Sequence, residues 1–211
     1  MKKLFLFFTL CFVAVVFTEC SVSRQIKEAK SLGDCTFRLQ SIDSIYLAGI
    51  DVRELRNISK VSDIDVSRYP GLGLAFLRKN IPLDLRVNLE ANNPTKKMAA
   101  VQEFEYKVLL SSHEIFSGVV NRRIEIPPGT GRTFIPINLG TNAYELFTND
   151  QTREEFLKMF EALTGKKDGA SSKLTIKIKP TLALGSQKVN YPGYITLEKD
   201  ITSDMILGES K

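Results

Sequence analysis

Histidine is almost absent from this sequence: the one residue, His113, falls in a predicted turn. A zinc site needs several histidine or cysteine ligands, and no second histidine or cysteine lies nearby in the sequence. Asp63 and Asp65 lack the glycine and closing glutamate of a calcium loop, and no serine has the flanking glycines of a nucleophile elbow. We therefore expect no metal, no cofactor and no enzymatic activity.

Cysteine is scarce as well, with three residues in the chain. Cys11 lies in the apolar N-terminal run and Cys20 directly follows that region, which leaves Cys35 alone in the expected domain. No internal disulfide is therefore predicted. Cys35 is on the same face as Phe37 and Leu39 of a predicted strand, so we interpret it as a small buried hydrophobe rather than a reactive thiol.

The chain also lacks a concentrated charge of one sign. The formal net charge is +5, and the lysines and arginines are spread along the sequence, so nucleic acid is not an expected partner. Lys166 and Lys167 are interpreted as part of a solvated loop. The hydrophobic fraction of 43% and the charged fraction of 25% are ordinary for a globular protein, and 211 residues suit one domain with an extension.

One long hydrophobic run is present, at the N-terminus. Met1-Lys2-Lys3 is basic, and the apolar run from Leu4 to Phe17 is shorter than the ~20 residues that a spanning helix needs. Residues 1–19 followed by Cys20 resemble a bacterial lipoprotein signal, in which the cysteine becomes the acylated first residue. The resemblance implies lipidation of Cys20 and a membrane-anchored position in the bacterial cell envelope, on the outer membrane or facing the periplasm. A simple secretory signal and an uncleaved anchor are the alternatives.

The clearest structural signal beyond this region runs from Leu83 to Pro94. Apolar residues alternate there with polar ones, and this period of two predicts a half-buried strand that ends at Asn93-Pro94. The same alternation recurs in several further segments, namely 36–40, 104–110, 115–120, 133–139, 174–178 and 194–201. Residues 111–114 are predicted to form a hairpin turn before the segment 115–120, in which Gly118 is expected to mark a bulge or a close approach. Short strands separated by Pro and Gly turns predict an antiparallel β-sandwich.

Helical periodicity is limited to a few places. Thr152 and Glu155 form a capping-box pattern, and Phe156, Met159, Phe160 and Leu163 follow at helical spacing, so an amphipathic helix is expected within an insertion near 141–164. A shorter helix is also expected, with Ser67 as its cap, Pro70 in its first turn, and an apolar face formed by Leu72, Leu74, Phe76 and Leu77. We interpret residues 20–34 as a tether or a frayed helix and residues 35–211 as the domain.

The order of these signals resembles a known family. The segments that carry the resemblance are Leu85-Arg-Val-Asn-Leu-Glu-Ala-Asn-Asn-Pro94, Phe104-Glu-Tyr-Lys-Val108, Ile115-Phe-Ser-Gly-Val119, Ile126-Pro-Pro-Gly129 and Thr133-Phe-Ile-Pro-Ile-Asn138. Together they are similar to the type 2 late-embryogenesis-abundant (LEA) domain, also called the water-stress and hypersensitive-response (WHy) domain. The resemblance implies an immunoglobulin-like or fibronectin-like sandwich, no catalytic residues, and a role in stress or as an envelope lipoprotein.

The function expected from these observations is that of a non-enzymatic envelope lipoprotein that binds or supports another envelope component. The alternative is a carrier for a lipid or other apolar ligand, held beneath the inserted helix with Phe156 and Phe160 as contacts. The same two side chains also suit a packed core, which is the more common fate of apolar residues at such spacing. An enzyme is the third hypothesis and would need a polar cluster assembled from distant loops.

Overall fold

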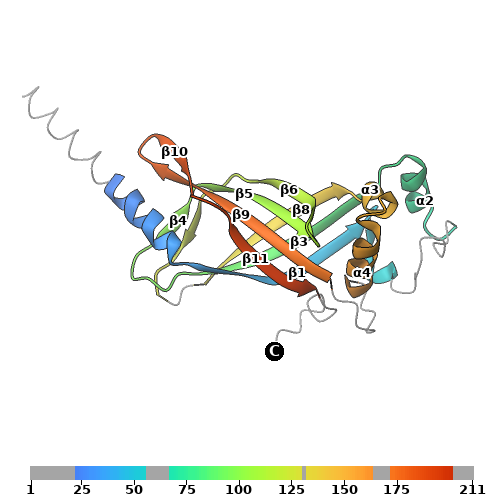
Figure 1. Cartoon of the computed structure of the whole chain (residues 1–211), viewed down its shortest axis with the longest axis horizontal. Coiled ribbons are helices and arrows are strands. Elements are labelled where there is room, and N and C mark those ends of the chain that lie inside the picture. The colour runs from blue at the N-terminus through green and yellow to red at the C-terminus, as the bar shows by residue number, and fades with distance from the viewer. Residues whose placement is uncertain (1–21, 56–66, 130–131, 164–171, 202–211) are drawn as a thin grey trace, which may run out of the picture.

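Two antiparallel sheets pack face to face, which confirms the predicted mainly β fold (Figure 1). The structure is a computed structural model that describes residues 22–55, 67–129, 132–163 and 172–201. The first sheet has the strand order β2-β1-β3-β8, formed by Ile50–Asp51, Thr36–Leu47, Pro82–Asn92 and Arg132–Asn142. The second has the order β10-β9-β5-β6, formed by Gln187–Asn190, Ser172–Leu184, Glu103–Leu110 and His113–Val120, and β11 (Ile195–Ile201) pairs with β9.

Strand β3 is the alternating segment that the sequence analysis singled out. It lies between β1 and β8, and its alternation of buried and exposed residues extends from Pro82 to Val87. Leu83, Leu85 and Leu89 are at most 7% exposed, and they join the core between the two sheets. The local pattern therefore predicts both the strand and its buried face correctly.

The predicted β5–β6 hairpin forms, but its turn is shorter than expected: Ser111 and Ser112 make the turn, and His113 is the first residue of β6. Its two-residue turn has positive φ angles at Ser111 (44°) and Ser112 (83°), a combination that matches the twist of the flanking strands. Gly118 lies opposite Tyr106, and a Cβ atom on Gly118 would approach the Tyr106 hydroxyl to 2.5 Å. The glycine therefore marks a close approach by an aromatic ring, which is one of the two roles that the sequence predicts for it.

Asn93 ends strand β3 through side-chain hydrogen bonds, beside the proline that follows it. Its side chain is 0% exposed, and its Nδ2 donates to the carbonyls of Lys97 at 2.8 Å and Ile126 at 3.0 Å. Its Oδ1 accepts from the Thr95 amide at 3.0 Å and from the Thr95 hydroxyl at 2.8 Å. These four bonds fix the loop after β3 and attach it to β7 (Ile124–Ile126), which pairs with β4 (Ala99–Val101).

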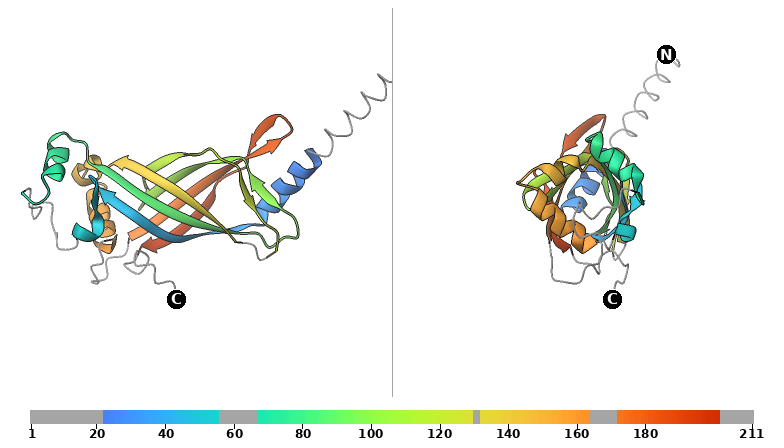
Figure 2. Two further views of the ribbon diagram at one scale, coloured as in Figure 1. Left: turned by 180° about the vertical axis from the view of Figure 1, so that it is seen from behind. Right: turned by 90° about the vertical axis from the view of Figure 1, so that its right-hand side faces the viewer.

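Helices gather at one end of the sandwich (Figures 1 and 2). They are η1 (Val52–Leu55), α2 (Pro70–Leu77), α3 (Tyr144–Thr148) and α4 (Arg153–Leu163). The last two occupy the insertion predicted near 141–164. Four aromatic rings hold three of these helices together, since Phe76 of α2 contacts Phe147 of α3 at 5.9 Å, and Phe147 contacts Phe156 and Phe160 of α4.

Both predicted helix caps need correction. Helix α2 begins at Pro70, and Tyr69, not Ser67, occupies the N-cap position. No side chain caps this helix. A proline suits the first helical position because the N–H that it lacks would have no partner within the helix there. Leu74 and Leu77 of α2 are 45% and 83% exposed, so the predicted apolar face is buried mainly through Leu72. The Glu155 carboxylate does not close a capping box; it accepts a bond from Ser111 Oγ at 2.8 Å, which ties α4 to the β5–β6 turn.

The opposite end carries the start of the described chain. Residues 22–33 form a helix there, called the N-terminal helix below, and it leads into β1. The β9–β10 hairpin and the loop between β3 and β4 extend at the same end (Figure 2). The domain therefore has one end closed by helices α2 to α4 and another end where the chain enters.

Candidate functional site

The N-terminal helix packs against the domain instead of hanging free from it. The sequence analysis left this segment as a tether or a frayed helix, but residues 22–33 are helical and Glu28, Ser31 and Leu32 are 6%, 4% and 1% exposed. Ala29 also packs against the core. The helix ends at Gly33, and hydrogen bonds from the Asp34 and Cys35 amides close its last turn.

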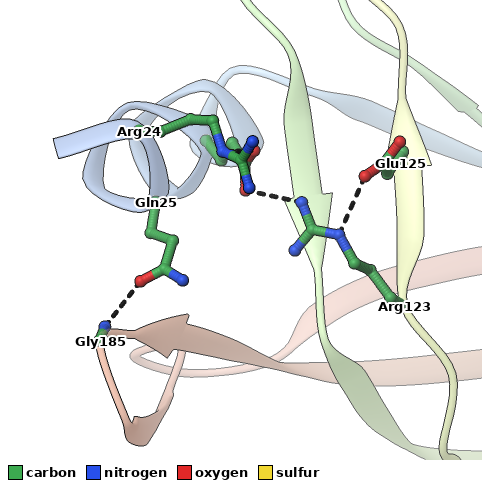
Figure 3. Close-up of polar contacts among 6 residues, drawn as sticks. Arg24, Gln25, Arg123, Glu125 and Gly185 are labelled. Carbon is green, nitrogen blue, oxygen red and sulfur yellow. Dashed lines mark hydrogen bonds and ion pairs between the residues drawn. The ribbon is translucent and has the colours of Figure 1, made fainter. Parts of the chain in front are cut away.

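An ion pair with a buried carboxylate holds the middle of this helix. Glu28 Oε2 accepts from Arg123 Nη2 at 2.9 Å, and Arg123 Nε donates in turn to Glu125 Oε1 at 2.9 Å (Figure 3). Arg24 lies one turn earlier and approaches Glu28 Oε1 at 3.4 Å. The hydrogen bond to Glu28 is the main cause that raises the pKa of the Arg123 guanidinium above its ordinary value. The arginine thus joins the helix to the strand that starts at Ile124.

A second contact holds the first turn of the helix. Gln25 Oε1 accepts a hydrogen bond from the Gly185 amide at 2.6 Å, in the turn between β9 and β10 (Figure 3). Gly185 has a φ of 65°, a conformation that glycine adopts without strain, and a Cβ atom at this position would lie 3.7 Å from Val22. The hairpin tip therefore lies against the very start of the described helix.

Replacing Arg123 by methionine should loosen this helix. Methionine keeps most of the apolar stem but leaves the Glu28 carboxylate buried with only the more distant Arg24, so we expect a loss of about 2 kcal/mol in helix docking. Hydrogen exchange of the amides of residues 26–33 measures this loss. Arg122→Met is the matched control, because Arg122 is exposed and reaches only the Pro136 carbonyl at 3.5 Å. Equal exchange in the two variants would show that the ion pair does not hold the helix.

Cys35 lies where the N-terminal helix passes into β1. Its Sγ donates to the Ser31 carbonyl at 3.3 Å, and its side chain packs partly buried against the core, as the sequence predicts for a small hydrophobe. Burial, followed by the nearby charge of Asp34, raises the pKa of the thiol to about 11. The group is therefore a neutral thiol at pH 7 and a poor nucleophile.

Phe156 and Phe160, the predicted apolar ligand contacts, lie in the helical end of the molecule. Phe156 is 0% exposed and Phe160 is 9% exposed. Their ring centroids are 6.5 Å apart, and Phe147 packs edge-on against Phe156 at 4.9 Å. Each ring therefore has other side chains as neighbours, as a packed core requires.

The remaining predicted positions are dispersed or lie outside the described residues. His113 is exposed at the start of β6. Within the described ranges, no group of three or more His, Cys, Asp or Glu residues is placed to hold a metal ion. Cys11, Cys20, Asp63, Asp65 and the Lys166-Lys167 pair fall outside these ranges. No helix of the described part has the length and apolarity needed to span a bilayer.

Sequence reasoning missed the two residues that fasten the helix. Glu28 and Arg123 are 95 positions apart, and neither lies in a motif. The one local hint is the three-residue spacing of Ile26, Ala29 and Leu32, which indicates a helix with an apolar stripe. Ile26 is 55% exposed, and only Ala29 and Leu32 pack against the domain, so this spacing is a weak indication of a docked helix.

The fold defines a class: a mainly antiparallel β protein with two packed sheets, helices at one end and a docked N-terminal helix at the other. No protein-family model matches the sequence, and the comparison with curated proteins finds no match. Among solved structures, a protein from Archaeoglobus fulgidus is 18% identical and has a TM-score of 0.35; the match covers 57% of this chain and 85% of that one.

Two further solved structures are similar at the same level. A protein from Arabidopsis thaliana is 13% identical, with a TM-score of 0.34 and a match over 57% of this chain and 70% of that one. A protein assigned provisionally to the late embryogenesis abundant (LEA) proteins is 14% identical, with a TM-score of 0.33 over 61% of this chain and 67% of that one. All these TM-scores are below 0.5, so we take no function from the matches.

Proposed function

We propose that the protein is a non-enzymatic lipoprotein of the bacterial cell envelope, anchored through Cys20, whose LEA type 2-like sandwich binds or supports another envelope component. The observation that carries the proposal is the docked N-terminal helix. Its first described residue, Val22, follows Cys20 by two positions, and the preceding segment has the composition of a lipoprotein signal. Glu28 and Gln25 fasten it to the domain.

The docking gives the anchor a mechanical role. An acyl chain on Cys20 would bring the first helical turn close to the membrane surface, and stable attachment takes more than one chain. Because the helix is fixed to the domain, the membrane would hold the sandwich in a preferred orientation, with α2, α3 and α4 at the end far from the lipid. A free tether would allow the domain to tumble.

The LEA-like part of the proposal rests on sequence motifs. The segments that carry the resemblance lie in β3, β5, β6, the turn that follows β7, and β8. Asn93 of the Asn-Pro pair has a structural role, because its side chain attaches the loop after β3 to β7. A role in stress, as members of that family have, is part of the proposal.

The packing does not favour a carrier of apolar ligands. Phe156 and Phe160 contact each other and Phe147, so a ligand between them would have to displace packed rings. The lipoprotein is for this reason the function that we propose.

Labelling with a fatty acid tests the anchor. The full chain, produced in a bacterial host that is fed an alkyne-tagged fatty acid, should carry the tag on Cys20. The Cys20→Ser variant should carry none, and a Cys35→Ser variant should be tagged like the parent because Cys35 is half-buried in the domain. A tag that persists in Cys20→Ser, or that is absent from the parent, would overturn the proposed anchor.

A further inference from the structure

Four lysines at the end of the molecule that carries the N-terminal helix have no acidic partner. They are Lys27 and Lys30 on the helix and Lys96 and Lys97 in the loop between β3 and β4; all four are exposed. Among the described residues, no carboxylate oxygen lies within 4 Å of the side-chain nitrogen of any of these lysines. The ion pairs at this end of the molecule involve other residues. Arg24 and Arg123 at the same end are paired with Glu28.

The loop that carries Lys96 and Lys97 is fixed in shape. The Lys97 carbonyl accepts from Asn93 Nδ2 at 2.8 Å and from Thr95 Oγ1 at 2.9 Å, and the Thr95 carbonyl accepts from the Gly129 amide at 2.7 Å. The lysine side chains take no part in these bonds. Met98, beside them, is 37% exposed. The loop thus presents two charges and an apolar side chain on a rigid backbone.

The helical end differs in its charge pairing. Arg53 is paired with Asp51, Arg153 with Asp150 at 3.2 Å, and Lys158 with both Glu154 and Glu155 at 3.1 and 3.2 Å. Much of the basic charge there is therefore neutralised by nearby acids. Arg78 and Lys79 are the exposed basic pair at that end without an ion pair among the described residues, whereas the four unpaired lysines lie at the end of the N-terminal helix.

We propose that these four end lysines contact the anionic headgroups of phospholipids and hold this end of the domain against the membrane surface. The inference rests on the proposed function, because the anchor brings the lysines to the bilayer. Basic side chains near an anionic surface strengthen an acyl anchor, and their attraction fades within a Debye length, so only residues at this end benefit. The acyl anchor proposed on Cys20, two positions before the first described residue of the helix, favours a lipid surface over another partner.

Footprinting of lysine amines tests this inference. The membrane-extracted full chain is reconstituted into vesicles of phosphatidylcholine alone or with 30% phosphatidylglycerol, and labelled with a membrane-impermeant amine reagent. We expect the four end lysines to react roughly fivefold more slowly in the anionic vesicles at low salt. Lys79, in the loop after α2 at the other end, should react equally in both, and 0.5 M salt should abolish the difference.

Matched charge reversals separate the outcomes. Lys96→Glu with Lys97→Glu should remove most of the protection at Lys27 and Lys30, whereas Arg78→Glu with Lys79→Glu, an adjacent exposed pair at the opposite end, should leave it intact. Thermal unfolding monitored by circular dichroism verifies that both variants are folded. Equal labelling in the two vesicle types, with the protein still bound after a high-salt wash, would overturn the lipid contact and leave the anchor standing. Equal labelling together with loss of the protein from the vesicles in that wash would overturn both.

Discussion

Replacing Asn93 by aspartate is expected to lower the free energy of unfolding by about 3 to 5 kcal/mol at pH 7. Asn93 is 0% exposed, and its Nδ2 donates to two backbone carbonyls, those of Lys97 and Ile126. A carboxylate would remove both donors and bring a buried negative charge against two carbonyl oxygens, which costs several kcal/mol. Urea unfolding followed by circular dichroism measures the loss.

The pH dependence gives this prediction a second test. Burial would raise the pKa of the new carboxyl, so its cost is present in full above that folded-state pKa and shrinks as the pH falls toward the ordinary value of about 4. Asn92→Asp is the control, since Asn92 is only half-buried at the end of β3 and faces Arg132 across the sheet. Similar losses in the two variants, or a loss independent of pH, would contradict the role assigned to Asn93.

Truncating Phe156 to alanine should cost about 3 to 5 kcal/mol. The ring is 0% exposed and packs edge-on against Phe147 at 4.9 Å, so its removal leaves a cavity between α4 and α3 and also removes an aromatic contact. The same urea titration measures the effect. Phe134→Ala on β8 is the control, because Phe134 is 59% exposed and its truncation should cost less than about 1 kcal/mol.

This result also bears on the carrier alternative. A residue that lined a ligand pocket would tolerate truncation in the free protein far better than a core residue, since no packed neighbours would be lost. A loss below about 1 kcal/mol for Phe156→Ala would therefore contradict the core role and bring the apolar-ligand hypothesis back.

Local patterns predicted much of the fold. Three patterns are each contained in a short stretch of sequence and each appears in the structure. They are the alternation in β3, the β5–β6 hairpin, and the helical spacing of Phe156, Met159 and Phe160. Period-two and helical patterns survive because burial of one face dominates the energetics of such elements.

Contacts between residues far apart in the sequence could not be predicted from local patterns. Glu28 meets Arg123 across 95 positions, and Glu155 leaves its predicted local bond for Ser111, 44 positions earlier. A charged residue in a polar segment does not reveal its ion-pair partner in the sequence, because that partner is determined by how the sheets bring distant segments together. The candidate site, which consists of such long-range contacts, could therefore not be predicted.

The intact mass of the protein extracted from membranes tests the central claim most directly. The account predicts the mass of a chain that begins at Cys20, increased by acyl groups. A chain that retains residues 1–19, or one cleaved there without acyl groups, would contradict the lipid anchor.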